Sequence, residues 1–178
     1  ALAALPSAGK PVTAEDRAYA TKLAEINRDI DNIRGTIIRQ TMFAEFEKLT
    51  HEMAETGEPL TVAAFKSVYQ DLLKAYFGPN FVIDDELSLE CFRIPHFYRP
   101  FYVYKYATGL AAAIALSEQV LCGGQHELNR YLSFLQGGCS KFPLDVLRDA
   151  GVDMEQVEPV ETALRHFATL VDKLDALL

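Results

Sequence analysis

The sequence predicts an all-α fold, a helical bundle-like subdomain, and three observations support this class. Apolar residues recur at alternating steps of three and four, which is the period of a helix that is buried on one side. Glycine and proline interrupt this pattern where helices are expected to end or begin. No dipeptide typical of a β-hairpin lies between segments with the two-residue period of a strand.

The longest expected helix covers about residues 14–55. Thr13 and Asp16 have the spacing of a helix-capping pattern at its start, and no proline follows before Gly57. Residues 1–12 contain two prolines among small side chains and are interpreted as a loose leader or an artificial boundary.

Shorter helices follow, and together they assign residues 13–178 to one helical subdomain. Several begin at a proline, which is tolerated at the first helical position because its missing N–H would have no partner there. The expected spans are about 62–76, 86–93, 100–121, 125–136, 143–150 and 159–176.

The composition excludes several classes of protein. Of the 178 residues, 49% are hydrophobic and 24% are charged, which are the values of a folded domain rather than a disordered chain. The net charge of -8 argues against nucleic acid and anionic membranes as partners. No apolar run reaches the roughly 18 residues of a membrane span. Three cysteines without a C-x-x-C pair indicate small buried thiols in a reducing cytoplasm, not disulfides or a thiolate zinc site.

One motif begins like a zinc site but is incomplete. His51-Glu52 starts the H-E-x-x-H pattern, in which two imidazoles one turn apart hold the metal, but Glu55 takes the place of the second histidine. We therefore expect no metal ligands here and interpret the segment as a solvated helix face. The isolated His126 and His166 are expected on the surface for the same reason, since charged residues adjoin them.

The most informative segment covers residues 93–106, where six aromatic residues fall within ten positions. Tyr98, Tyr102 and Tyr106 are four apart and would lie along one side of a helix. Together with His96 in the preceding loop, these phenols could form a wall of donors for a carbonyl or an oxyanion. They could equally form a stacked aromatic core with satisfied hydroxyls. Composition does not decide between these readings.

Four stretches of the sequence resemble the C-terminal portion of oligoendopeptidase F, a family of zinc metallopeptidases that cleave short peptides. They are RGTIIRQTMFAEFE (34–47), RIPHFY (93–98), FYVYKYATG (101–109) and FPLDVLRDAGVDM (142–154). The stretches are long, in order and correctly spaced, and the resemblance covers about residues 30–175.

The resemblance implies a largely helical fold with a deep substrate channel. It also implies a zinc ion in the intact enzyme, held by H-E-x-x-H and a Glu on a following helix, neither of which this sequence contains. The family's substrate-contacting and intermediate-stabilising roles fall on His96 and Tyr102 as catalytic residues. Tyr98 and Tyr106 are further candidates for substrate binding.

The first functional hypothesis is therefore the C-terminal part of a zinc oligopeptidase that is inactive alone. Its partners would be an oligopeptide substrate and the missing N-terminal zinc-bearing portion, which a separate chain could also supply. Apolar surface left uncovered would favour self-association. The alternative is a catalytically inert helical binding or scaffold module with a tyrosine-rich core or groove.

Overall fold

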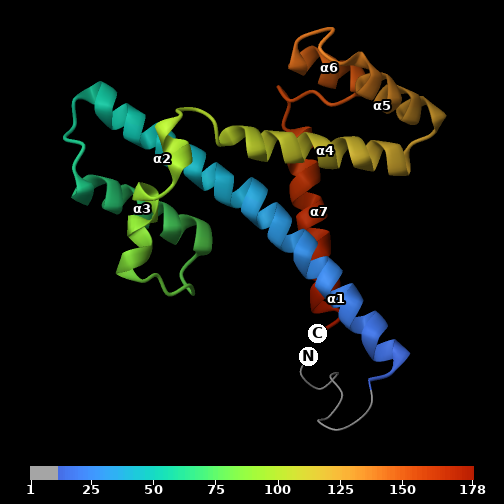
Figure 1. Ribbon diagram of the computed structural model, residues 1–178, viewed down its shortest axis with the longest axis horizontal. Coiled ribbons are helices and arrows are strands. Elements are labelled where there is room, and N and C mark those ends of the chain that lie inside the picture. The colour runs from blue at the N-terminus through green and yellow to red at the C-terminus, as the bar shows by residue number, and fades with distance from the viewer. Residues whose placement is uncertain (1–11) are drawn as a thin grey trace. The chain divides into compact units, whose positions relative to one another are not determined.

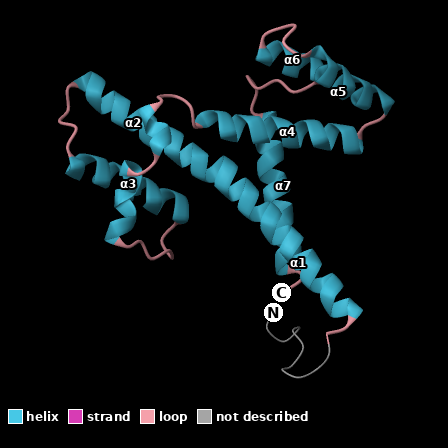
Figure 2. Cartoon of the chain, in the orientation of Figure 1, coloured by secondary structure: helices cyan, strands magenta, loops and turns pink. Residues whose placement is uncertain are grey.

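The computed structural model describes residues 12–178, and every regular element in this part of the chain is a helix (Figure 2). The expected all-α class is confirmed. The expected leader lies outside the described residues, apart from Val12. In chain order, the elements are α1 (Ala14–Ile33), the π-helical turn η2 (Arg34–Ile38), α2 (Arg39–Thr56), α3 (Val62–Phe77), the 3-10 helices η3 (Asp85–Phe92) and η4 (Pro95–Tyr98), α4 (Tyr104–Cys122), α5 (Gln125–Gly137), α6 (Pro143–Ala150) and α7 (Glu158–Asp175) (Figure 1).

The first long helix is present as expected, with a π-turn in its middle. The Thr13 hydroxyl oxygen accepts a bond from the Asp16 N–H at 3.1 Å, and the Asp16 carboxylate accepts one from the Thr13 N–H at 2.8 Å. Gly57 ends the helix with a φ of 78°, in the left-handed region that glycine adopts without strain. Between α1 and α2 the chain takes a wider π-turn around Gly35, which is a local insertion that the periodicity does not reveal.

The helix expected to begin at Pro100 begins only at Tyr104. Phe101 has a φ of 58°, which is incompatible with a right-handed helix, and it is the one non-glycine residue with positive φ among those described. The prediction of a helix start at Pro100 is therefore wrong, and the residues before α4 form a turn.

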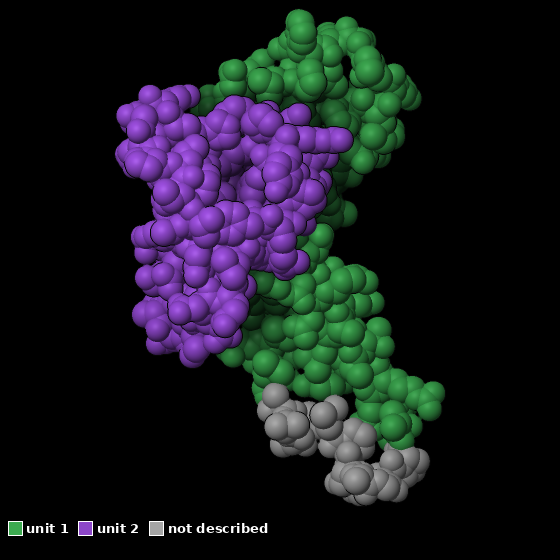
Figure 3. Space-filling model, turned by 60° about the vertical axis from the view of Figure 1, so that its left-hand side comes forward, with its two compact units in different colours: residues 1–34, 108–178 green, residues 35–107 purple. Residues whose placement is uncertain are grey.

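The chain divides into two compact units, shown in Figure 3. Unit 2 comprises Gly35–Ala107, and unit 1 comprises the described residues up to Arg34 and from Thr108 onward. The helices at the boundary, η2 and α4, contribute residues to both units.

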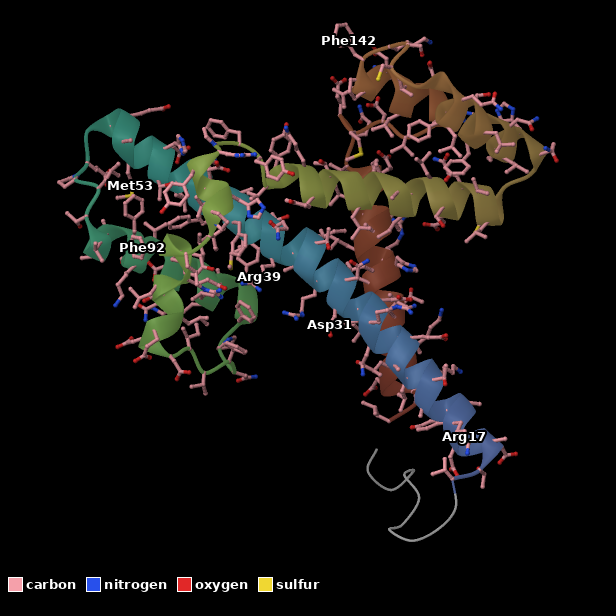
Figure 4. The ribbon with its side chains drawn as sticks, in the orientation of Figure 1. Arg17, Asp31, Arg39, Met53, Phe92 and Phe142 are labelled. Carbon is pink, nitrogen blue, oxygen red and sulfur yellow. The ribbon has the colours of Figure 1, made fainter. Side chains whose placement is uncertain are left out.

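Unit 2 is built around α3, which packs against α2 and against η3. Its core is aromatic and aliphatic, and its buried members are Met42, Phe43, Phe46, Tyr69, Leu72, Leu73, Cys91, Ile94 and Val103. The Glu90 carboxylate is buried beside this core. It pairs with Arg39, which is labelled in Figure 4, and with Arg93, and it accepts a hydrogen bond from the Tyr69 hydroxyl at 2.7 Å.

Unit 1 contains two helix pairs, α1 with α7 and α5 with α6. Small side chains dominate the buried cluster between α4 and the end of α6, namely Ala112, Ala115, Leu116, Ala150 and Val152. The Gln119 side chain donates to the Gly151 carbonyl at 2.8 Å, and the Arg130 guanidinium donates to the Asp149 carbonyl at 3.0 Å. These bonds fix the end of α6 in place because they satisfy carbonyls that the helix itself leaves open.

Two expectations from composition concern membranes and thiols. Among the described helices, none is both long and apolar enough to cross a bilayer. The three cysteines are free, but only Cys91 is buried, whereas Cys122 and Cys139 are exposed. The expectation of three buried thiols was therefore wrong for two of them.

Candidate functional site

The loop that carries His96 is fixed in unit 2 by Phe97. The Phe97 ring lies 5.6 Å from the ring of Phe43 and 5.1 Å from that of Phe46, both on α2. Because η4 is a single tight turn, packing of the partly buried Phe97 against the core leaves the flanking side chains of His96 and Tyr98 exposed. The aromatic core thus sets the orientation of His96, although His96 itself is not part of the core.

Val103 fixes the second part of the site in the same way. Its side chain is 1% exposed and belongs to the core of unit 2, whereas the neighbouring Tyr102 and Tyr104 are exposed. The chain therefore has two core anchors, Phe97 and Val103, and each holds a polar aromatic neighbour at the surface.

His96, Tyr102 and Tyr106 come together as a trio of rings. The rings of His96 and Tyr102 are stacked at 5.7 Å with an interplanar angle of 14°, and the Tyr106 ring meets that of Tyr102 edge-on at 5.5 Å. The Tyr106 hydroxyl lies 3.5 Å from both the His96 Nε2 atom and the Tyr102 hydroxyl. Lys105 places its ammonium group 5.5 Å from the centre of the Tyr102 ring.

The polar atoms of this trio are accessible. Tyr102 is 39% exposed and Tyr106 is 37% exposed, so neither phenol is sealed in the core. The hydrogen bond that Tyr106 donates to Tyr102 raises the pKa of Tyr106, because loss of its proton would break that bond. Tyr106 therefore stays protonated at neutral pH and can donate a hydrogen bond.

Tyr98 does not share this position. The expected helix through Tyr98, Tyr102 and Tyr106 is absent, and within residues 12–178 no ring contact or hydrogen bond joins Tyr98 to the trio. Tyr98 is 80% exposed and borders a cavity of about 340 Å³ in unit 2. The cavity is mainly apolar, with Phe46, Ala54, Leu60, Phe65, Cys91, Phe92, Ile94 and Phe97 in its walls and Glu47, Thr50 and His51 as polar members.

The metal that the resemblance implies has no donor set here. His51 lies half-buried on α2, and its Nδ1 atom lies 2.7 Å from the Glu47 carbonyl oxygen, while Glu52 and Glu55 are exposed. Among residues 12–178, no group of three or more His, Cys, Asp or Glu side chains is arranged to hold a metal ion. The residues present do not fit a zinc site.

The other histidines follow their expected placement in part. His126 and His166 are exposed on α5 and α7. His51 was expected on a solvated face, but it is half-buried and its ring packs 4.8 Å from that of Phe101. Sequence reasoning also missed Glu47, a carboxylate that is only 4% exposed, because nothing local distinguishes it from the other acidic residues of its helix.

A family model described as Peptidase family M3 matches residues 10–166. The chain is 51% identical over 157 residues to "Oligopeptidase PepF" of Bacillus subtilis, an alignment that covers 88% of this chain and 23% of that protein. It is 43% identical over 145 residues to an "Oligoendopeptidase F homolog" of Borreliella burgdorferi, covering 82% of this chain and 25% of that protein.

A solved structure agrees with these matches. The crystal structure of oligoendopeptidase-F from Enterococcus faecium matches with a TM-score of 0.86 at 38% identity, covering 89% of this chain and 30% of that one. The chain thus spans about a quarter of the length of the relatives it matches. These matches do not confirm the expected placement in the C-terminal portion.

Proposed function

The chain belongs to peptidase family M3, and we propose that it forms part of an oligopeptide-cleaving metallopeptidase, contacting the substrate through exposed histidine and tyrosine side chains. The observation that carries the proposal is the trio of His96, Tyr102 and Tyr106, whose rings meet at the surface of unit 2. Two anchors packed in the core of unit 2, the partly buried Phe97 and the buried Val103, hold His96 and Tyr102, so these donors are ordered before a ligand arrives.

Within the trio, His96 and Tyr102 are assigned the catalytic contacts. An imidazole N–H and a phenolic O–H can both donate to a peptide carbonyl whose oxygen gains negative charge during attack. Loss of one such donor typically costs about 10²–10³ in rate. Tyr106 and Tyr98 are assigned to substrate binding, with Tyr98 at the mouth of the apolar cavity.

The zinc of the intact family enzyme would be held by residues outside the given sequence, since the described residues offer no fitting donor set. The zinc-bearing portion is therefore a partner of this segment within the proposal. A reducing cytoplasmic location belongs to the same proposal, because the free, exposed Cys122 and Cys139 suit such a compartment.

The first test measures peptide binding by the chain itself. In a labelled sample, short peptides are expected to shift the resonances of His96, Tyr102 and Tyr106 together, and His96→Ala is expected to weaken binding. His126→Ala is the matched control, since it removes an exposed histidine of unit 1. Peptide binding that His96→Ala does not weaken, or that shifts only the resonances of residues lining the apolar cavity, would favour an inert binding module instead.

The second test measures catalysis in a chimera. The aligned 157 residues of the Bacillus subtilis relative are replaced by those of this chain, which are 51% identical. Tyr102→Phe in that chimera is expected to lower kcat by about 10²–10³ with little change in KM, because the hydroxyl acts on developing charge. An unchanged kcat would remove Tyr102 from the reaction.

A further inference from the structure

The backbone at Phe101 takes a conformation that its side chain disfavours. Its φ of 58° lies in the left-handed region, which a residue with a β-carbon seldom adopts outside glycine, asparagine and aspartate. Such a conformation persists only where the surrounding structure holds it. Phe101 directly precedes Tyr102, so whatever holds Phe101 also sets the position of Tyr102.

The holding group is the buried carboxylate of Glu47. Its Oε1 atom accepts a hydrogen bond from the Phe101 N–H at 2.5 Å, across 54 residues of sequence. Glu47 is 4% exposed, and a buried carboxylate that accepts a backbone N–H forms a short and strong bond. Glu47 thus connects α2 to the turn before α4.

His51 completes the arrangement one turn further along α2. Its Nδ1 atom lies 2.7 Å from the Glu47 carbonyl oxygen, so this nitrogen carries the proton and donates. Its ring then packs against that of Phe101, with centroids 4.8 Å apart. Glu47 holds the backbone of Phe101, and His51 supports its ring.

We infer that Glu47 and His51 are positioning residues, which hold Phe101 in its left-handed conformation and thereby place Tyr102 against His96. A helical φ at Phe101 would continue the chain as the helix expected from Pro100 and would send Tyr102 in another direction. The inference rests on the proposed function, because it explains how the substrate-contacting trio is assembled. It also gives His51 a role that does not involve a metal.

The test compares Glu47→Ala with Glu52→Ala, which removes an exposed carboxylate from the same helix. Glu47→Ala is expected to abolish the ring-to-ring NMR contact between His96 and Tyr102 and to weaken peptide binding about tenfold, the loss of one hydrogen bond. Glu52→Ala is expected to change neither. Retention of the ring contact in Glu47→Ala would overturn the inference.

Two further variants separate positioning from a general loss of stability. Adding Phe101→Gly to Glu47→Ala is expected to recover part of the affinity, because glycine adopts positive φ without a holding group. Glu47→Gln keeps an acceptor oxygen and the shape, so it tests the inference even if Glu47→Ala fails to fold. The Phe101 amide proton is expected far downfield in the wild-type chain and less so in Glu47→Gln, and an unchanged resonance would contradict the bond.

The positioning role of Glu47 and the proposed function can fail separately. If the wild-type chain binds no peptide, the proposed function fails, while the amide resonance and the His96–Tyr102 contact still decide the role of Glu47. If the wild-type chain binds peptide and Glu47→Ala leaves both readouts unchanged, only the positioning role fails.

Discussion

The two residues assigned the catalytic contacts, His96 and Tyr102, each adjoin an apolar residue that packs in the core of unit 2. Phe97 packs against the rings of Phe43 and Phe46, and it turns His96 outward. Val103 is buried, and it turns Tyr102 outward. Because the apolar neighbour is rigid, its partner is held at the surface at little further cost in conformational entropy.

Tyr102→Phe is expected to lower the pKa of Tyr106. The hydrogen bond that Tyr106 donates to the Tyr102 oxygen favours the protonated phenol, and phenylalanine cannot accept it. Ultraviolet titration of the phenolate band measures the shift, with Tyr98→Phe as the control. A Tyr106 pKa that stays the same or rises would show that the two hydroxyls do not interact.

The three thiols are expected to react at very different rates. Burial raises the pKa of Cys91 to about 11, so almost none of it is thiolate at pH 8, whereas Cys122 and Cys139 are exposed. A chromogenic disulfide reagent should therefore label two thiols quickly and the third only when unit 2 unfolds. Cys91→Ala should leave the fast phase unchanged, and three equal rates would contradict the assignment.

At the scale of single residues, the sequence predicted those features of the candidate site that depend on local chemistry. Clustering and hydroxyl content indicated His96, Tyr102 and Tyr106, and the structure brings their rings together. The prediction that Tyr98 lies on the same side of a helix as Tyr102 and Tyr106 was wrong, because it assumed a helix through Phe101. Glu47 could not have been found, since its partner lies 54 residues away and such a contact is set by tertiary packing.

At the scale of elements, helix ends were predictable where glycine or proline dictates them. Gly57 and Gly151 take left-handed conformations at the ends of α2 and α6, and Pro143 begins α6. The π-turn at Gly35 and the late start of α4 were not predictable. Both depart from local preference. The late start of α4 follows from the hydrogen bond by which Glu47, on α2, holds the backbone of Phe101.

Glu90→Ala is expected to destabilise unit 2. Glu90 joins η3 to α2 and α3, and its loss leaves the Tyr69 hydroxyl buried without an acceptor and two arginines without a counter-charge. The free energy of unfolding should fall by about 2–3 kcal/mol, which is less than for a fully buried pair because both arginines are partly exposed.

Urea unfolding followed by circular dichroism measures the effect of Glu90→Ala. Asp71→Ala on α3 is the control, since its exposed carboxylate pairs with Lys74 on the same helix, and its effect should stay within about 0.5 kcal/mol. Equal effects of the two substitutions would mean that Glu90 does not link the elements of unit 2.

At the scale of the whole chain, large apolar side chains remain at the surface. Val82 is 84% exposed, Leu121 is 80% exposed, and Phe142, labelled in Figure 4, is 81% exposed. The relatives that the chain matches are about four times as long, so in such a protein further chain could cover surface of this kind. The isolated chain instead has to expose it or bury it against another copy.

Self-association of the chain is therefore expected at high concentration. Burial of apolar surface between copies stabilises the associated form by roughly 25 cal/mol per Å² before the cost of association is subtracted. Sedimentation velocity over a range of concentrations measures it, and Leu121→Glu or Phe142→Glu should weaken it if that residue lies in the contact. A single monomer boundary at the highest concentration would contradict this prediction and show that the exposed apolar residues do not drive association.

The chain by itself is expected not to hydrolyse oligopeptides. Oxyanion donors such as His96 and Tyr102 contribute about 10²–10³ each in rate, but they supply neither the activated water nor the Lewis acid that a bound zinc ion provides. The sequence has no H-E-x-x-H motif, and the described residues offer no alternative donor set for zinc. A fluorogenic oligopeptide with added Zn²⁺ tests this, with the Bacillus subtilis relative as the positive control. Cleavage by the purified chain that a chelator abolishes and Zn²⁺ restores would mean that a metal site forms from residues that the structure keeps apart.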